Sequence, residues 1–477
     1  MTDGTTWVAW SVIFPLGGAL TTLFFGRRGA VLAIPVALGT LGVNIRLAAL
    51  IHARGTLHHR VGGWGAPLGI ELRADGAAAL MLVAFSVVGA LVSVYALTYF
   101  SVGHRRSAYF ALWLLAWAAL DALLVSNDVF NLYVALELLT LTAVGLIALE
   151  HHRTALASAF RYLILALAGS LGYLVGVALL YGEHATLDIG LFGKITVPSR
   201  ITSTGLAMMT VGLCLKAALF PLHAWLPPAY ASASPPVSAL LSGLIGKTSF
   251  LVLLRVWPEL VPTHANGGGP AQLLGALAGT CIVWGSLLAL RQRRLKALIA
   301  YSSLAHVGYM FLFFPLGTQM AKAGVVYLAI SHAAASAAMF TATGTIERDA
   351  RSDDIAGLKG VAHRRPLTFF AIGIAGTSLM GLPPSGGFIA KWLIVRSALE
   401  CGQWWWAFVA LAGGLMAAGY VFRILRIAFL NSSPLDDDDT MPAQHKSDLL
   451  PLALALVSLA LGIAPRWPLA LLEGAPS

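Results

Sequence analysis

The sequence predicts an all-α polytopic membrane protein with about fourteen transmembrane helices. Of its 477 residues, 58% are hydrophobic and 11% are charged, whereas a soluble protein of this size carries roughly a quarter charged residues. Long apolar stretches recur from one end of the chain to the other, and a helix satisfies its own backbone in lipid. The alternation of apolar and polar residues that marks a transmembrane barrel is not found in the sequence.

Charged or Gly/Pro-rich breaks divide the apolar stretches into predicted spans. Their approximate limits are 7–25, 29–50, 75–100, 107–125, 128–149, 156–181, 203–222, 235–257, 270–290, 296–316, 322–344, 366–398, 404–430 and 448–470. We expect one membrane domain, 1–477. Its expected parts are N-terminal helices (1–106), a first repeat (107–257), a second repeat (270–430) and a last helix (448–470).

The seventh and twelfth predicted spans are interrupted by proline and glycine. The interruptions are LFPLHAWLPPAY (219–230) and MGLPPSGGFIAKW (380–392). Proline breaks the ladder of helix hydrogen bonds and glycine permits tight turns, so both spans are predicted to be discontinuous helices. The residues expected to shape the breaks are Pro221, His223, Pro227, Pro383, Pro384 and Gly386. Two such breaks in corresponding positions predict an internal repeat.

Several ionisable residues lie inside predicted spans. They are Glu137, Lys216, Lys247, His306, His332 and Lys391. A charge near the bilayer centre is costly, so such residues usually face a partner or a water-filled path. Carboxylate, lysine and histidine side chains together can relay protons. The spacings 391 − 216 = 175 and 306 − 137 = 169 are similar, which predicts two inverted five-helix repeats with these residues in equivalent places.

The sequence leaves a structural alternative open for most of these residues. Glu137 can be a protonated carboxyl bonded to a neighbouring helix, and Lys216 can extend toward the membrane surface. Lys247 can pack against a carbonyl, and His306 can be a hydrogen-bonded core histidine. His332 lies among small residues that also suit close helix packing.

The formal net charge is +10, and most of the Arg and Lys residues lie in short loops between spans. Membrane topology explains this placement better than nucleic acid binding, so no nucleic acid partner is expected. The loops after odd-numbered spans hold more of these cations. This asymmetry predicts that those loops are cytoplasmic and that both termini lie on the outer side of the cell inner (plasma) membrane. Interfacial pairing is the expected role of charges near span ends, namely Asp75, Asp121, Arg161 and Arg255.

The cysteines Cys214, Cys281 and Cys401 are far apart, and the sequence contains no CxxC or CxxH motif. A metal or iron–sulfur site built by this chain alone is therefore not expected. The sequence also shows no Rossmann fingerprint or P-loop. No cofactor bound by this chain is expected, and any redox chemistry would belong to partner subunits.

Four segments together resemble the antiporter-like membrane subunits shared by respiratory complex I, membrane-bound hydrogenases and Mrp-type cation/proton antiporters. The segments are DVFNLYVALELL, KAALFPLHAWLPPAY with SPPVSALLSGLIGK, LKALIAYSSLAHVGYM, and GLPPSGGFIAKW. The resemblance covers most of the chain and implies a fourteen-helix fold with a central polar axis. It also implies an ion pair of Glu137 with Lys216, a connecting lysine at Lys247, a central histidine at His306 and an exit lysine at Lys391.

Within that family the chain is most similar to the D-type subunit of the Mrp antiporters. The segment GGWGAPLGIELRADGAAALMLV (62–83) and Lys391 favour this similarity. Two positions depart from the family pattern. Pro228 stands where an acidic residue often follows HAWLP, and Ser336 stands where many relatives carry lysine. Transfer between the two halves is then expected to rely on His306 and His332.

The resemblance leaves three functions open. The first is exchange of protons for a monovalent cation, Na⁺ or K⁺, by a multisubunit Mrp-type antiporter. The second is a proton-pumping subunit of a complex I-like NADH:quinone oxidoreductase or a membrane-bound hydrogenase. The third is a subunit that lets protons through to drive another uptake system. In each case the expected partners are other membrane subunits and the lipid bilayer, and no catalytic site is expected in this chain.

Overall fold

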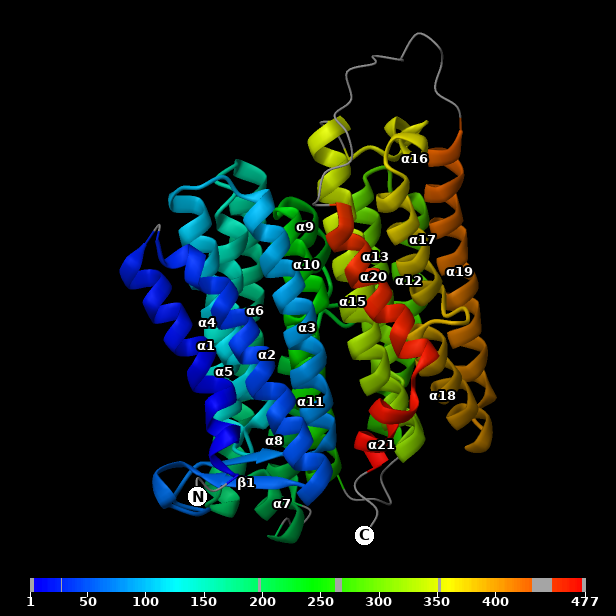
Figure 1. The fold of residues 1–477 in the computed structure, drawn as a ribbon. Coiled ribbons are helices and arrows are strands. Elements are labelled where there is room, and N and C mark those ends of the chain that lie inside the picture. Colours follow the sequence, from blue (N-terminus) through cyan, green and yellow to red (C-terminus); the bar gives the residue numbers. More distant parts are fainter. Residues whose placement is uncertain are drawn as a thin grey trace.

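The structure, a computed structural model, describes residues 4–26, 28–195, 199–261, 268–350, 353–430 and 448–473. Long helices run side by side in one bundle (Figure 1). The N-terminal part contains α1 (Thr6–Phe25), α2 (Gly29–Arg54), β1 (Leu57–Arg60), β2 (Glu71–Ala74) and α3 (Gly76–Tyr99). The predicted first repeat contains α4 (His104–Val125), α5 (Val129–Ala148), α6 (Arg153–His184), α7 (Ile189–Ile195), α8 (Arg200–Lys216), α9 (Leu226–Ser232), α10 (Pro235–Gly243) and α11 (Thr248–Leu260).

Helices and the loops between them make up the described residues of the predicted second repeat and the C-terminal part. They contain α12 (Gly269–Arg291), α13 (Leu295–Phe311), α14 (Phe313–Leu316), α15 (Gln319–Ala350), α16 (Val361–Arg364), α17 (Pro366–Met380), α18 (Gly386–Glu400), α19 (Trp404–Phe429), α20 (Leu449–Ile463) and α21 (Arg466–Glu473). Short 3-10 turns lie at Val61–Gly63, Ile245–Lys247 and Ile355–Leu358.

The predicted fold class, a polytopic helical membrane protein, is confirmed. In the described part of the chain, 11 helices are long and apolar enough to cross a membrane. Helices α20 and α21 form a further pair bent by 73°. The predicted number of fourteen is reached only if α8 with α9 and α17 with α18 are also counted as broken spans, so that number stays a prediction.

The polar interval between α2 and α3 contains an antiparallel hairpin, which the sequence prediction missed. Strand β1 pairs with β2 from Leu57↔Ala74 to Arg60↔Glu71. Each strand has only 4 residues, too few for an alternating pattern to stand out in the sequence. The hairpin also contacts the loop after α4, including a backbone hydrogen bond of 3.1 Å from Asn127 N to Glu71 O. These contacts join segments that are distant in the sequence.

The two ends of the bundle differ in what they carry. Helix α1 begins and α21 ends at the end of the bundle that bears β1 and β2, called here the hairpin end (Figure 1). The opposite end bears α16 and is called here the α16 end. A common side for the two chain ends agrees with an even number of spans. That the hairpin end faces the outer side of the membrane stays a prediction.

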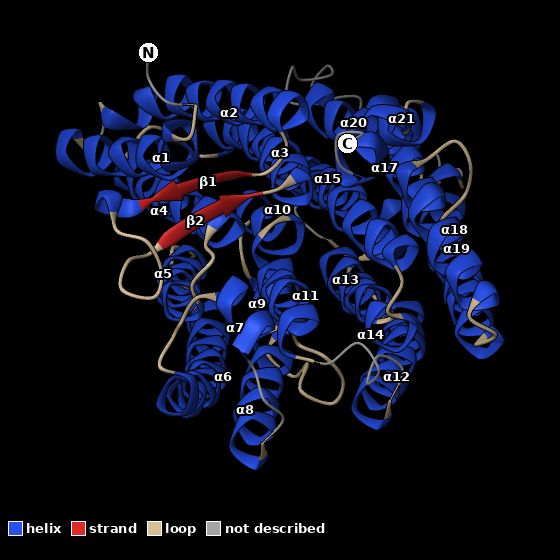
Figure 2. Ribbon diagram, turned by 90° about the horizontal axis from the view of Figure 1, so that it is seen from below, coloured by secondary structure: helices blue, strands red, loops and turns tan. Residues whose placement is uncertain are grey.

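The centre of the bundle is formed by α10, α11, α13 and α15. In the most apolar windows of these helices, 94% of the α10–α11 residues, 89% of the α13–α14 residues and 94% of the α15 residues are buried. The corresponding share is 33% for α1 and for α19 at the periphery. Viewed along the bundle, the central helices lie between α2 and α20 on one edge and α8 and α12 on the other (Figure 2).

Both predicted helix breaks are present, and a third separates α10 from α11. Helix α8 ends at Lys216 before the first break, and α17 ends at Met380 before the second. Lys216 thus precedes its break, and Lys391 follows its break inside α18, in the order that the sequence predicts. That the two lysines hold equivalent places in an inverted repeat stays a prediction.

Candidate functional site

Glu137 of α5 and Lys216 of α8 form an ion pair inside the bundle. Lys216 Nζ lies 2.9 Å from Glu137 Oε1. Ser170 of α6 joins both partners, because its hydroxyl donates to Glu137 Oε1 and its oxygen accepts from Lys216 Nζ at 2.5 Å. The Lys216 side chain is 4% exposed and that of Glu137 is 18% exposed, which excludes extension of this lysine to the surface. The structure thus brings the expected pair together.

Facing glycines on α6 and α8 allow this arrangement. A Cβ on Gly169 would lie 2.7 Å from the carbonyl oxygen of Gly212, and a Cβ on Gly212 would lie 2.3 Å from that of Gly169. Only hydrogen side chains permit so close an approach of two helix backbones, as in other membrane helix pairs. Ser170 follows Gly169, and Lys216 lies one turn after Gly212, so the same contact brings these two polar side chains together.

Lys247 lies at the break between α10 and α11. Its Nζ donates to the carbonyl oxygens of Ser242 at 2.5 Å and Gly243 at 2.6 Å, in the last turn of α10. A helix end leaves its last carbonyls without partners within the helix. The ammonium therefore satisfies carbonyls that the break exposes. Packing against carbonyls, which the sequence left open for Lys247, is present, although it does not exclude a part in proton transfer.

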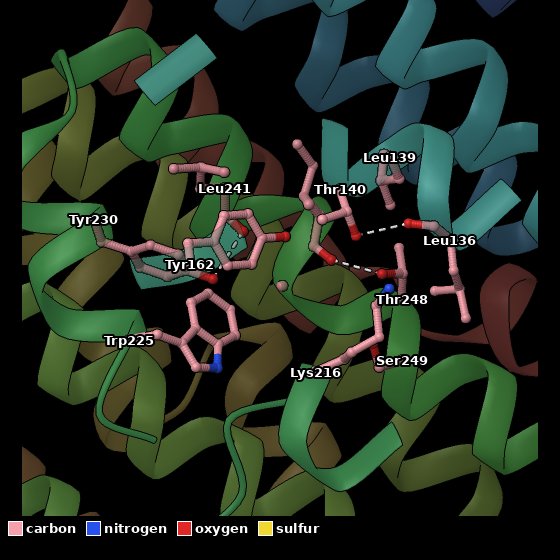
Figure 3. Close-up of a pocket in the computed structure, with 12 residues that line it drawn as sticks. Leu136, Leu139, Thr140, Tyr162, Lys216, Trp225, Tyr230, Leu241, Thr248 and Ser249 are labelled. Carbon is pink, nitrogen blue, oxygen red and sulfur yellow. Dashed lines mark hydrogen bonds between the residues drawn. The ribbon is translucent and has the colours of Figure 1, made fainter. Parts of the chain in front are cut away.

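A small cavity lies between Lys216 and the 3-10 turn that holds Lys247. Tyr162, Trp225, Tyr230 and hydroxyl side chains of α5 and α11 surround it (Figure 3). Its size suits a single water molecule. Thr140, Thr248 and Ser249 supply the hydroxyl groups. A site with hydroxyl groups in its lining thus lies between the first lysine and the helix break at the centre of the bundle.

His306 of α13 and His332 of α15 stack on each other at the centre. Their ring centroids are 4.3 Å apart and their planes make an angle of 26°. His306 Nδ1 lies 2.8 Å from the carbonyl oxygen of Ser302. His306 Nε2 and both ring nitrogens of His332 are buried and have no hydrogen-bond partner within the described residues. Lys247 and Lys391 are close enough to act electrostatically on both rings.

Lys391 of α18 reaches back across the second break. Its Nζ donates to the carbonyl oxygens of Leu379 at 2.8 Å and Met380 at 3.2 Å, which end α17. The ammonium also lies 4.3 Å from the centroid of the Tyr309 ring, a cation–π contact. Gly381 ends α17 with φ of +82°, and a Cβ there would lie 2.5 Å from Lys391 Cδ. This glycine therefore provides both the turn and the space for the lysine.

The three lysines share one electrostatic feature. Lys216 is the last residue of α8, Lys247 caps the end of α10, and Lys391 caps the end of α17. The carboxyl end of a helix carries partial negative charge, which favours a nearby cation. Each break in the membrane region thus places a partly negative helix end beside a lysine. The breaks stabilise positive charge inside the bundle without requiring a carboxylate at every position.

The remaining predicted break residues fall in or beside the two breaks. Pro221 and His223 lie between α8 and α9, where the His223 ring stacks on Phe220 at 5.5 Å. Pro383 and Pro384 lie between α17 and α18. Two others belong to helices instead: Pro227 is near the start of α9, and Gly386 is the first residue of α18.

Sequence reasoning missed two buried polar groups. Asp121 is fully buried and accepts a 3.2 Å hydrogen bond from Asn44, so its expected interfacial role is wrong. Lys296 is buried and pairs with Glu347 at 3.1 Å. Lys296 and Glu347 lie at the limits of predicted spans, where charged residues are common. Only the position of Lys296 within LKALIAYSSLAHVGYM could have distinguished it.

Comparisons with known proteins agree with this geometry. A family model described as NADH:quinone oxidoreductase/Mrp antiporter, TM, matches residues 126–417. The chain is 33% identical over 468 residues to the N subunit of NADH-quinone oxidoreductase from Desulforudis audaxviator, covering 95% of this chain and 93% of the relative. It is 28% identical over 432 residues to the D-type subunit of the Na(+)/H(+) antiporter from Alkalihalophilus pseudofirmus, covering 89% and 87%.

Solved structures show the same architecture. A chain of the archaeal membrane-bound sulfane sulfur reductase superposes with a TM-score of 0.90 at 27% identity, covering 98% of this chain and 96% of that chain. A chain of the Mrp complex from Dietzia sp. superposes with a TM-score of 0.88 at 23% identity, covering 99% and 96%.

Proposed function

The chain belongs to the NADH:quinone oxidoreductase/Mrp antiporter transmembrane family, and we propose that it exchanges protons for Na⁺ as a subunit of an Mrp-type antiporter. It is a multi-pass membrane protein and a proton-translocating antiporter-like subunit of the Mrp or complex I type. The proposal adds the choice of Na⁺ antiport and the residues that carry the proton. The Glu137–Lys216 ion pair, buried beside a broken helix, is the observation that carries the proton relay, and the similarity to the D-type subunit of an Na(+)/H(+) antiporter supports the choice of Na⁺.

Proton transfer begins, in this proposal, when the pair separates. With Glu137 in contact, its carboxylate stabilises the charged form of Lys216. When the carboxylate moves away, an ammonium group with little contact with water loses its counter-charge, and the loss favours release of its proton. Because Lys216 ends α8 directly before the break, a change at the break moves the lysine relative to α5.

The released proton then crosses the bundle. The hydroxyl-lined cavity leads from Lys216 toward Lys247, which receives the proton in its neutral form. The stacked rings of His306 and His332 connect Lys247 with Lys391. Neutral imidazole accepts a proton at one nitrogen and releases one from the other, which suits a central step. Lys391 completes the relay in the second half of the chain.

Replacing Glu137 by glutamine tests the proposal. Glutamine preserves the shape and the hydrogen bond with Ser170 but cannot ionise. We expect Na⁺-dependent proton flux in vesicles that contain the whole native complex to fall to background, while the amount of assembled complex stays unchanged. Flux near the native level in the Glu137→Gln variant would remove this residue from the mechanism.

A second candidate function is proton pumping driven by redox chemistry in partner subunits. The 33% identity to the N subunit of an NADH-quinone oxidoreductase, against 28% to the D-type subunit of an antiporter, favours it. Purification of the complex from its native membrane separates the two functions. Flavin or iron–sulfur subunits in the complex select the redox-driven pump, whereas small membrane subunits and Na⁺-dependent flux select the antiporter.

We also propose that the hairpin end faces the outside of the cell membrane. The asymmetry of Arg and Lys supports this orientation, because Arg105, Arg293 and Arg294 lie in loops after odd-numbered spans. Cysteines placed at His58 and at Arg293 test it in intact cells with a membrane-impermeant thiol reagent. Labelling at position 58 alone supports the orientation, and labelling at position 293 alone reverses it.

A further inference from the structure

Helices α13 and α15 carry two titratable pairs that face each other. Near the α16 end, Lys296 Nζ of α13 lies 3.1 Å from Glu347 Oε1 of α15. Ten residues further along α13, about 15 Å at 1.5 Å per residue, His306 stacks on His332 of α15. The relay proposed above uses only the second pair. The first pair has no part in that relay, although it lies between the same two helices.

Hydroxyl side chains occupy the same helix faces between the two pairs. At about 100° per residue, Lys296, Ser303 and His306 fall within about 80° of one another around α13. Around α15, Glu347 and His332 fall within about 60° of each other, and the intervening Thr343 and Ser336 lie within this range. All three hydroxyl residues are buried. We call Lys296, Ser303, Ser336, Thr343 and Glu347 the α13–α15 seam.

The seam begins near the protein surface. The Glu347 side chain is 21% exposed, whereas that of Lys296 is 9% exposed. Lys296 Nζ also lies 3.3 Å from the carbonyl oxygen of Ala233, directly after α9. A second ion pair, Arg294 with Asp353 at 2.8 Å, lies at the same end, and this hydrogen bond raises the pKa of Arg294. A carboxylate with partial access to water, paired with one buried lysine, thus stands at the start of the seam.

The seam ends at the relay. Ser303 Oγ lies 2.7 Å from Ser242 Oγ of α10. The backbone carbonyl of Ser242 accepts from Lys247 Nζ at 2.5 Å. On the same face of α13, His306 follows Ser303 by one turn. Polar side chains therefore lie at intervals along the facing sides of α13 and α15, from Glu347 at one end to the histidine pair and the Ser303–Ser242 contact beside Lys247 at the other.

We propose that Glu347 takes up protons from water at the α16 end and that the α13–α15 seam delivers them to His306 and His332. This inference rests on the proposed function, to which it adds a second point of proton uptake. The Glu347 carboxylate binds a proton from the aqueous phase and later releases it to the hydroxyl groups of the seam. Lys296 remains the counter-charge and positions the carboxylate. In the proposed orientation this uptake is from the cytoplasm, and it supplies the centre of the relay, where onward transfer still depends on the switch at Glu137 and Lys216.

Proton flux in vesicles that contain the whole complex tests the uptake. We expect Glu347→Gln to lower the flux about tenfold, because glutamine cannot take up a proton, and Glu347→Asp to restore most of it. The amount of assembled complex is measured in parallel. Full flux in Glu347→Gln while Glu137→Gln is inactive overturns the seam and leaves the proposed function standing. Full flux in both variants overturns the proposed function itself.

Thiol labelling tests the seam without disturbing its ion pair. Thr343→Cys and Thr341→Cys are nearly isosteric changes on one helix, and both positions are buried, but Thr341 lies on the opposite face of α15. For this test the three native cysteines, Cys214, Cys281 and Cys401, are first replaced by alanine. We expect a small cationic methanethiosulfonate, added from the α16 side, to react about tenfold faster at position 343, because only that position contacts a hydrated path. Equal rates at the two positions overturn the seam.

Discussion

The two halves of the chain hold lysine in different ways. In the first half, Lys216 pairs with the carboxylate of Glu137 on another helix. In the second half, Lys391 has no acidic partner within the described residues and binds the carbonyls of Leu379 and Met380 and the face of Tyr309. A carboxylate can move away from its lysine and so change the charge beside it, whereas backbone carbonyls and a packed ring are fixed. In the proposed relay, the first half would therefore switch and the second half receive the proton.

The largest expected effect comes from Lys216. We expect Lys216→Ala to lower proton flux at least about a hundredfold, and Lys216→Arg nearly as much, because arginine keeps its charge but does not release its proton. Flux is measured in vesicles with the whole complex. If the lysine served only as a fixed counter-charge for Glu137, arginine would restore most of the flux, and the difference between the two halves would disappear.

A smaller loss is expected at Lys391. Lys391→Arg keeps the positive charge beside the carbonyls but cannot release a proton, so flux should fall about tenfold. The proton flux of the Lys391→Met variant should fall by at least as much. Because no acidic partner is left unpaired within the described residues, both variants should assemble at native levels, which quantitative blotting of the purified complex can check. Poor assembly of both would show that this lysine is chiefly structural.

Replacing His306 and replacing His332 should lower proton flux by different amounts. His306 keeps one nitrogen on the Ser302 carbonyl, while neither nitrogen of His332 has a partner within the described residues. We expect His332→Gln to lower flux about fivefold and His306→Gln to lower it more, because the seam leads to His306 and the His306 ring and Lys391 both contact Tyr309. The two variants are compared at equal amounts of complex. A larger loss at His332 would reverse the order of the two rings in the relay.

The smallest effect is expected at Ser170. Its hydroxyl joins Glu137 and Lys216 but does not change its charge during transfer. We expect Ser170→Ala to lower flux only about twofold to threefold, because the direct contact between Lys216 and Glu137 remains when the bridging hydroxyl is removed. Ser158→Ala, which removes a buried hydroxyl elsewhere on α6, serves as the control in the same flux assay. Equal flux in both variants would show that the pair does not need its serine.

Several features of the fold and site could be predicted from residues alone. Fourteen apolar stretches and the proline breaks at 219–230 and 380–392 follow from local composition, because a helix in lipid must satisfy its own backbone. The membrane fold and the family were therefore accessible before the structure. The six proposed relay residues were visible as charges where lipid tolerates few. Their part in proton transfer stays a proposal.

Other features depended on contacts between distant segments. The β1–β2 hairpin has strands too short to leave a pattern, and the 3-10 turn at Ile245–Lys247 contains no proline that would have marked it. Glu347 could not be separated from ordinary loop charges, because its burial depends on how α13 lies against α15. Ser170 resembles other serines in small-residue helices until α8 is placed beside it.

The sequence by itself determined that this chain lies in a membrane, where proline and glycine break two of its helices, and which residues are titratable. These properties depend on side chains and on backbone within a few residues. Only the tertiary structure decided which titratable groups meet. Glu137 and Lys216 are 79 residues apart, and their contact requires α8 to approach α6 through facing glycines. Apolar periodicity marks a helix in lipid, but the partners of its polar residues depend on the packing of the whole bundle.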